Sequence, residues 1–142
     1  MDQYAWAVTP GEDAAFNKIP TAVSEKPGSV KELARWRKHA DLQGWMEKLY
    51  VEKCESHGVE PRRGEEDSWL EGEVNFNCIP LLLTGNDLDE LEVAVCEKSM
   101  PHTTGFFFGS SHPEHDYSTL EFIREAREAI AADMLVYYDS WW

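Results

Sequence analysis

Basic residues and long apolar runs are both scarce in this chain of 142 residues. Thirteen Lys and Arg stand against 27 Asp and Glu, which gives a formal net charge of −14 and a pI of about 4.6. Because phosphates are neutralised by positive surface, this balance argues against a general nucleic-acid binder. No run approaches the ~18 apolar residues of a membrane span, and the first residues lack a basic and then apolar signal pattern. We therefore expect no membrane contact and a cytoplasmic location.

Cysteines and metal-ligand patterns are also sparse. Cys54, Cys78 and Cys96 are odd in number and widely spaced, which favours three free thiols in a reducing compartment over a disulfide framework or zinc site. His112 and His115 are separated by Pro113, and spacing fixes no third ligand. This segment predicts an N-cap and a loop, and no metal.

Motifs for catalysis are absent as well. Ser110 and Ser111 follow no G-x-S-x-G elbow, and the phenylalanines of residues 105–109 oppose a phosphate-binding loop. The sequence therefore predicts no catalytic residues and no cofactor.

Apolar residues are present in a proportion that supports a real core. They make up 42% of the chain, and aromatic residues make up 12%. The length fits a single domain, in which residues 1–29 hold a first strand and a long surface loop and residues 30–142 form the main body. A strand is expected over residues 3–8 and the loop over residues 11–29.

Residues 30–55 carry the longest periodic pattern. Their apolar residues recur at steps of three and four, which predicts an amphipathic helix with Ser29 as its N-cap. A break near His39, with residues 34–38 extended and a later helix start, is the alternative. The other expected elements are a strand over 73–83, a helix from Thr84 to Met100, an aromatic strand over 105–109, a loop over 112–116, a helix over 118–132 and a strand over 134–138.

This element order predicts an α+β fold. We expect a small, mostly antiparallel or mixed sheet of about four strands with about three helices packed on it. Four residues are expected on adjacent strands, packed by two from a helix. The four are Phe106, Phe108, Val136 and Tyr138, and the two are Leu120 and Ile123.

Negative charge is concentrated in the second part of the chain. Residues 1–63 hold ten basic and ten acidic residues, whereas residues 64–142 hold three basic and seventeen acidic ones. A plain solvated surface is one interpretation, and a face that meets a basic partner or imitates the phosphates of nucleic acid is the other. The residues predicted to bind such a partner are Glu65, Glu66, Asp67, Asp87, Asp89, Glu90 and Glu92.

A local basic cluster suggests a different site. Residues 35–38 interleave Arg and Lys with a tryptophan, a combination that can bind a phosphate or a base, although internal pairing with the acidic part is the alternative. The pocket predicted around this cluster consists of Trp36, Arg37, Lys38, Trp45, Tyr138 and Trp141.

Several short motifs resemble a family of small proteins of tailed phages. They are Trp36-Arg-Lys, Gly44-Trp45, the stretch from Met100 to Gly109 that contains Gly-Phe-Phe-Phe-Gly, and Val136-Tyr-Tyr-Asp-Ser-Trp141. The resemblance covers about residues 30–142 and implies a shared fold and a phage accessory role. Family members are often labelled phosphoglycerate kinase, but this chain is too short for a two-lobed kinase and has no nucleotide loop. It also has Ala40 and Gln43 where the family has Asn and His.

Two functions are therefore expected from the sequence. The first is a phage-encoded, non-enzymatic accessory protein in the host bacterial cytoplasm. It would bind and inhibit a host or defence macromolecule, a protein with a basic surface, through the acidic surface. The second is a small-molecule or nucleotide binder, or an enzyme, that uses the aromatic pocket.

Overall fold

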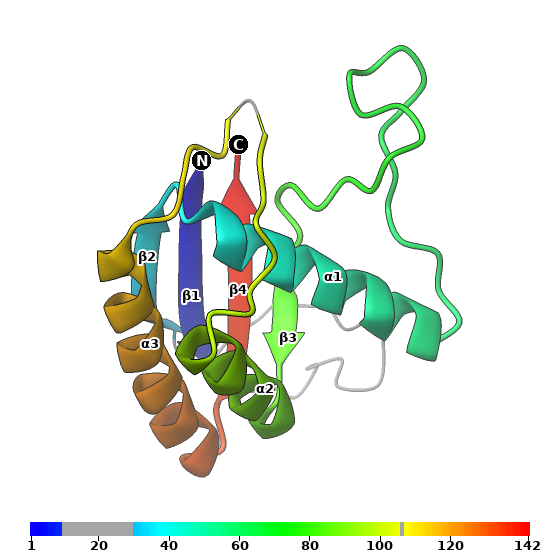
Figure 1. Ribbon diagram of the computed structural model, residues 1–142. Helices are drawn as coiled ribbons and strands as arrows, with labels where there is room; N and C mark the ends of the chain where they lie inside the picture. The colour runs from blue at the N-terminus through cyan, green and yellow to red at the C-terminus, as the bar shows by residue number, and fades with distance from the viewer. Residues whose placement is uncertain (10–29, 106) are drawn as a thin grey trace.

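A single antiparallel sheet organises the molecule. The computed structural model describes residues 1–9, 30–105 and 107–142, and within them four strands follow the order β2-β1-β4-β3. Three helices cover one face of this sheet (Figure 1). The predicted α+β class is confirmed. The elements are β1 Asp2–Val8, β2 Val30–Arg37, α1 Ala40–Ser56, β3 Leu81–Leu83, α2 Gly85–Cys96, α3 Pro113–Ala131 and β4 Leu135–Trp141.

The two central strands are β1 and β4. They pair along their full length, from Asp2 opposite Trp141 to Val8 opposite Leu135. Burial alternates along β1, where Gln3, Ala5 and Ala7 are inaccessible to solvent. Alanines there leave room for the helices to pack closely. The expected first and last strands are both confirmed, although β4 extends to Trp141.

Strand β2 occupies a segment for which a helix was predicted. Ala5 pairs with Ala34 and Trp6 pairs with Glu32, so that Leu33 is the additional residue of a β-bulge. The bulge puts Leu33 and Trp36 both in the core although they lie three positions apart. This step of three imitates helical periodicity, which is why the helix predicted from Val30 was wrong over β2.

The alternative break near His39 is confirmed. Lys38 has a positive φ of 56°, a left-handed conformation that interrupts the extended chain, and α1 begins two residues later. The predicted loop over residues 11–29 lies outside the described residues, and so does Ser29, the predicted N-cap of the helix from Val30.

Residues 73–83 form less strand than expected. Only Leu81–Leu83 pair with β4, while Cys78 adopts a φ of 56°. The Arg62 side chain donates to the carbonyl oxygens of Asn75 and Asn77, which takes these groups out of any strand pairing. The predicted long strand was therefore wrong before Leu81.

Helices α2 and α3 are both present, with shifted ends. The Thr84 hydroxyl accepts from the Asp87 amide at 3.2 Å, and the Asp87 carboxylate accepts from the Thr84 amide at 2.8 Å, which forms a capping box at the start of α2. This helix ends at Cys96 rather than at Met100. Helix α3 begins at Pro113, so residues 113–116 belong to the helix and not to the predicted loop. His112 is its N-cap, several residues before the predicted start of this helix at residue 118.

The aromatic strand predicted over residues 105–109 is wrong. The described residues of this segment form a turn, in which the Phe108 amide donates to the Gly105 carbonyl at 3.1 Å. Phe108 is therefore not on a strand beside Val136 and Tyr138, and Phe106 lies outside the described residues. The prediction was wrong because a run of aromatic residues is typical of a buried strand, whereas here it lies in a turn.

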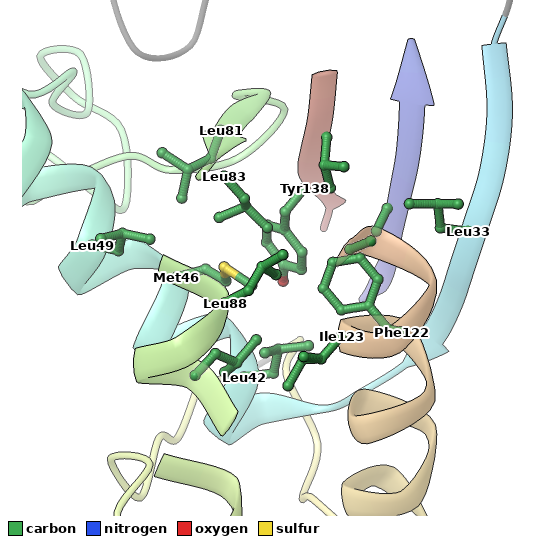
Figure 2. Packing of buried hydrophobic residues seen from close by; sticks show 14 of the residues in the cluster. Leu33, Leu42, Met46, Leu49, Leu81, Leu83, Leu88, Phe122, Ile123 and Tyr138 are labelled. Carbon is green, nitrogen blue, oxygen red and sulfur yellow. The ribbon is translucent and has the colours of Figure 1, made fainter. Parts of the chain in front are cut away.

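The core lies between the sheet and the helices. Leucines of α1, α2 and β3 surround the Tyr138 ring, and Phe122 and Ile123 of α3 close the cluster near Leu33 (Figure 2). Ile123 is fully buried as predicted, while Leu120 packs against the cluster from a half-buried position. The core fixes how α1 and α2 sit relative to each other, and the candidate site lies between these two helices.

Candidate functional site

A groove of about 560 Å³ lies between α1 and α2. Its apolar lining consists of Trp45 and Leu49 from α1, of Val93 and Ala94 from α2, and of Pro101 from the segment after α2. Trp45 is half-buried, and Val93 is 53% exposed although it is a large apolar residue on a helix. Leu49 and Ala94 are buried, so Trp45 and Val93 provide most of the apolar surface that is open to solvent in the groove.

Charged side chains border this α1–α2 groove. Lys48 and Glu52 come from α1, and Asp89 and Glu90 come from α2. Within the described part of the chain, Lys48, Glu52 and Glu90 take part in no salt bridge. Their charges are therefore directed to solvent rather than neutralised internally.

Asp87 does not belong to the acidic surface predicted from the sequence. It is 6% exposed, caps α2 and forms an ion pair with Lys53. The Lys53 ammonium also donates to the Leu82 carbonyl at 2.6 Å, so the pair joins α1, β3 and α2. The role of Asp87 is to hold the framework of the groove.

Asp89 and Glu92 lie on the surface but are paired with α3. One guanidinium nitrogen of Arg127 is 2.7 Å from an Asp89 oxygen, and the other is 2.7 Å from a Glu92 oxygen. Of the predicted acids on α2, Glu90 alone is exposed and without an ion pair among the described residues. Glu90 is thus the member of this set best placed for an external contact.

The other predicted acids lie in a different region. Glu65, Glu66 and Asp67 are exposed in the chain excursion between α1 and β3. Figure 1 shows this excursion projecting away from α2. The seven residues predicted from the sequence therefore do not form one continuous surface.

The alternative pocket is not assembled either. Trp36 and Tyr138 are core residues, with 3% and 0% exposure, and the Trp36 indole donates to the Ser118 hydroxyl at 2.9 Å. Trp45 lines the α1–α2 groove, whereas Trp141 is 63% exposed on β4. Buried Trp36 and Tyr138 have no free surface with which to line a pocket.

The basic cluster lies on the edge strand β2. Arg37 and Lys38 are exposed, and Arg35 pairs with Glu32 at 3.2 Å while its guanidinium lies 4.9 Å from the centre of the Tyr4 ring. Charged side chains on an edge strand hinder pairing with a strand of another molecule. This position gives the cluster a structural role.

A buried polar network connects β1, β4 and the start of α1. The Gln3 amide exchanges hydrogen bonds with the backbone of His39 at 2.8 and 2.9 Å and donates to the Tyr138 hydroxyl at 2.8 Å. That hydroxyl in turn donates to Gln43 at 2.5 Å. Burial raises the pKa of Tyr138, which keeps its hydroxyl protonated as a donor.

His39 is the titratable centre of this network. Its Nδ1 lies 2.7 Å from the Ser111 hydroxyl and its Nε2 lies 3.2 Å from that of Thr119. The Thr119 hydroxyl donates its proton to the His115 carbonyl, so it can only accept a hydrogen bond from the His39 ring. We therefore assign the ring proton to Nε2, and the Ser111 hydroxyl donates to Nδ1. Burial, with a smaller effect of His115, lowers the pKa of His39 to about 3, so the ring is neutral at pH 7.

Ser111 and His39 have the spacing of a nucleophile and its base, but their environment assigns them a structural role. The Ser111 oxygen also accepts from the Asp41 amide at 3.0 Å and thereby caps α1, whose N-cap His39 provides no side-chain bond. His39 is 0% exposed. A base must reach a substrate proton, and this ring is fully covered.

Metal ligands do not cluster among the described residues: no group of three or more His, Cys, Asp or Glu side chains is placed to hold an ion. The His115 ring accepts from the His112 amide at 3.0 Å and so completes the cap of α3. In the same part of the chain, no helix is both long enough and apolar enough to cross a membrane.

Comparisons with protein-family models, with curated proteins and with solved structures give no match for this chain. The resemblance to small tailed-phage proteins therefore stays a prediction.

Sequence reasoning missed part of the groove. Leu49, Glu52 and Val93 were not among the predicted site residues, although Trp45, Leu49 and Glu52 follow the i, i+4, i+7 spacing of one helical stripe. The sequence predicts Leu88, Leu91 and Val95 on the inner face of this helix, and Val93 is not among them. An apolar residue at an outward helical position was the available signal.

Proposed function

We propose that the protein is a non-enzymatic binding protein that takes a basic, partly apolar segment of another protein into the α1–α2 groove. In the setting that the phage resemblance implies, the partner is a host or defence protein whose activity is blocked by the contact. The observation that carries this proposal is an open, partly apolar groove whose border holds two unpaired carboxylates, Glu52 and Glu90, and one unpaired ammonium group, Lys48, among the described residues.

The apolar floor would supply most of the binding free energy. Burial of apolar surface contributes about 25 cal/mol per Å² removed from water, and tryptophan is enriched among residues that dominate interfaces. Trp45 and Val93 offer such surface from facing helices. A partner helix or extended segment with apolar residues along one side would cover it.

The charge around the groove would select a basic partner. Helix α2 contains four acidic residues and no Lys or Arg, and α3 contains five acidic residues and two arginines. Complementary charge accelerates encounter and excludes acidic competitors, and it is weakened by salt. The same surface would repel nucleic acid.

The proposal is tested by capture from host cells followed by kinetics with the purified partner. The bait is the whole chain as wild type, as Trp45→Ala, and as the double variant Glu52→Gln with Glu90→Gln. A matched control replaces Glu114 and Glu121 with Gln, since these two acids of α3 are exposed and form no salt bridge with the described residues. We expect Trp45→Ala to raise the dissociation rate and the double amide variant to slow association, mainly at low salt, while the control binds as wild type.

Two results would oppose this function. If every groove variant retained its partner with unchanged rates, the groove would not be the contact surface. If binding depended instead on Arg37 and Lys38, the basic edge of β2 would be the site.

A further inference from the structure

An aromatic pocket of about 280 Å³ lies on a different face of α1 from the groove. Trp69 comes from the excursion between α1 and β3, Phe108 from the segment between α2 and α3, and Trp142 follows β4. Figure 1 shows these three parts of the chain approaching the same end of the molecule. The pocket thus gathers aromatic residues that are far apart in the sequence.

The rings contact one another without stacking. The ring centres of Trp69 and Trp142 are 5.5 Å apart at 68°, and those of Phe108 and Trp142 are 5.1 Å apart at 78°. A stacked pair hides one face of each ring, whereas an edge-to-face pair leaves more ring face uncovered. Trp69 is 66% exposed, so much of its surface is open to a ligand.

Two carboxylates line the same pocket. Glu47 of α1 is half-buried, and Glu73 of the excursion is exposed. Neither forms a salt bridge within residues 1–9, 30–105 and 107–142. Burial raises the pKa of Glu47, and the neighbouring Glu73 adds to this effect. The carboxylates of Glu47 and Glu73 are repelled by the negative faces of the aromatic rings and by each other. A cation bound between them would be attracted by both the carboxylates and the rings.

We infer that this aromatic pocket binds an organic cation, an ammonium or guanidinium group on an alkyl stem. The negative faces of indole and phenyl rings attract such groups, and rings assembled around a cation are the known mode of recognising alkylated ammonium ions. Glu47 and Glu73 add direct charge attraction. Leu70 and Val74, which also line the pocket, provide apolar contact for the stem.

The ligand can be a lysine or arginine side chain of another protein or a free quaternary ammonium compound, because both share this chemistry. The inference does not rest on the proposed function. The aromatic pocket and the α1–α2 groove share no lining residue, so either proposal can be wrong while the other is right.

The test is a titration of the whole, ¹⁵N-labelled chain followed by NMR at the indole N–H groups of its six tryptophans. Choline is compared with 3,3-dimethyl-1-butanol, which has the same shape and no charge, at constant ionic strength. We expect saturable shifts of the Trp69 and Trp142 signals with choline and roughly tenfold weaker binding of the neutral alcohol. Acetylated lysine and arginine amides and trimethyllysine then distinguish a side-chain ligand from a free quaternary one.

Variants localise the binding. Trp69→Ala should abolish saturable shifts, and Glu73→Gln should weaken binding several-fold; both residues are exposed, so the melting temperature should stay near that of wild type. The matched controls are Trp141→Ala, another exposed tryptophan, and Glu66→Gln, another exposed acid of the excursion. Both controls should bind as wild type, and so should Trp45→Ala in the groove.

Equal binding of choline and the neutral alcohol would overturn the inference in favour of an apolar site. Absence of saturable shifts with every cation, or shifts that persist in Trp69→Ala, would also overturn it.

Discussion

Two aromatic clusters among the described residues differ in burial, in hydrogen bonding and in the elements that hold them. The first, here the core cluster, consists of Trp36, Tyr50, Phe76, Phe122 and Tyr138, each at most 4% exposed. The second, the loop cluster, consists of Trp69, Phe107, Phe108 and Trp142, which are exposed or half-buried and lie outside the helices and strands.

The two clusters also differ in whether the polar atoms of their aromatic side chains have hydrogen-bond partners. In the core cluster the Trp36 indole and the Tyr50 and Tyr138 hydroxyls have hydrogen-bond partners. In the loop cluster the Trp142 indole N–H is buried with no partner among the described residues. A satisfied, covered cluster stabilises the fold, whereas an incompletely satisfied and open one is better suited to a ligand. Aromatic content alone does not distinguish the two.

The largest expected effect comes from deleting a ring of the core cluster. Phe122 is 1% exposed, and its ring meets that of Trp36 edge to face at 5.3 Å. Phe122→Ala should lower the free energy of unfolding by about 3–5 kcal/mol, because the ring's apolar contacts are lost and a cavity is left. Urea unfolding measures this loss. A change below about 1 kcal/mol would mean that the core cluster is not the stabilising one.

Replacing a buried acid of α2 should have a smaller effect on stability than Phe122→Ala, but a larger effect than replacing an exposed acid of the same helix. Asp87→Asn removes the charge partner of Lys53 and weakens the capping box, which should cost about 1–3 kcal/mol. Glu90→Gln, on the exposed side of α2, should change stability by less than about 0.5 kcal/mol. Thermal unfolding of the two variants measures the contrast, and equal losses would contradict the structural role of Asp87.

The third effect is a pH dependence centred on His39. Burial lowers its pKa to about 3 in the folded protein from the ordinary histidine value of 6.5, so the unfolded chain takes up this proton first as the pH falls. The stabilisation is complete above pH 6.5 and should decrease by at most about 1.4 kcal/mol per pH unit between pH 6.5 and about 3. His115, whose pKa burial also lowers, adds in the same direction.

Unfolding free energies between pH 7.5 and 5.5 measure this dependence above the range in which most carboxylates take up protons. His39→Gln should reduce the slope, because it removes the group whose pKa is lowered on folding. A slope that His39→Gln does not alter would assign the dependence to other groups.

The sequence predicts most elements correctly where one physical rule dominates. Alternation identifies β1, and the Thr84 cap together with the following leucines identifies α2. Prediction failed where tertiary contacts override local pattern. The bulge at Leu33 gave a strand the spacing of a helix, and the Arg62 bonds to residues 75 and 77 prevented a long strand before Leu81.

Individual residues of the candidate site were predictable from the sequence, but their arrangement in space was not. Trp45 was predicted as part of the aromatic pocket, and Asp89 and Glu90 as part of the acidic surface. The packing of α1 beside α2 brings all three to one groove. The Lys53–Asp87 pair that supports this packing joins residues 34 positions apart in the sequence. No local pattern indicates such a pair.

The pairing of β1 with β4 has a consequence for biosynthesis. These strands are neighbours at the centre of the sheet, but in the order of the described elements β1 is translated before the other six and β4 after them. Until β4 leaves the ribosome, β1 can pair only with β2, and the buried amide of Gln3 lacks the Tyr138 hydroxyl. The half-made sheet would expose the apolar side of β1 and one unpaired edge. Closure of the sheet is therefore expected to be a late and comparatively slow event, since contacts between distant residues fold slowly.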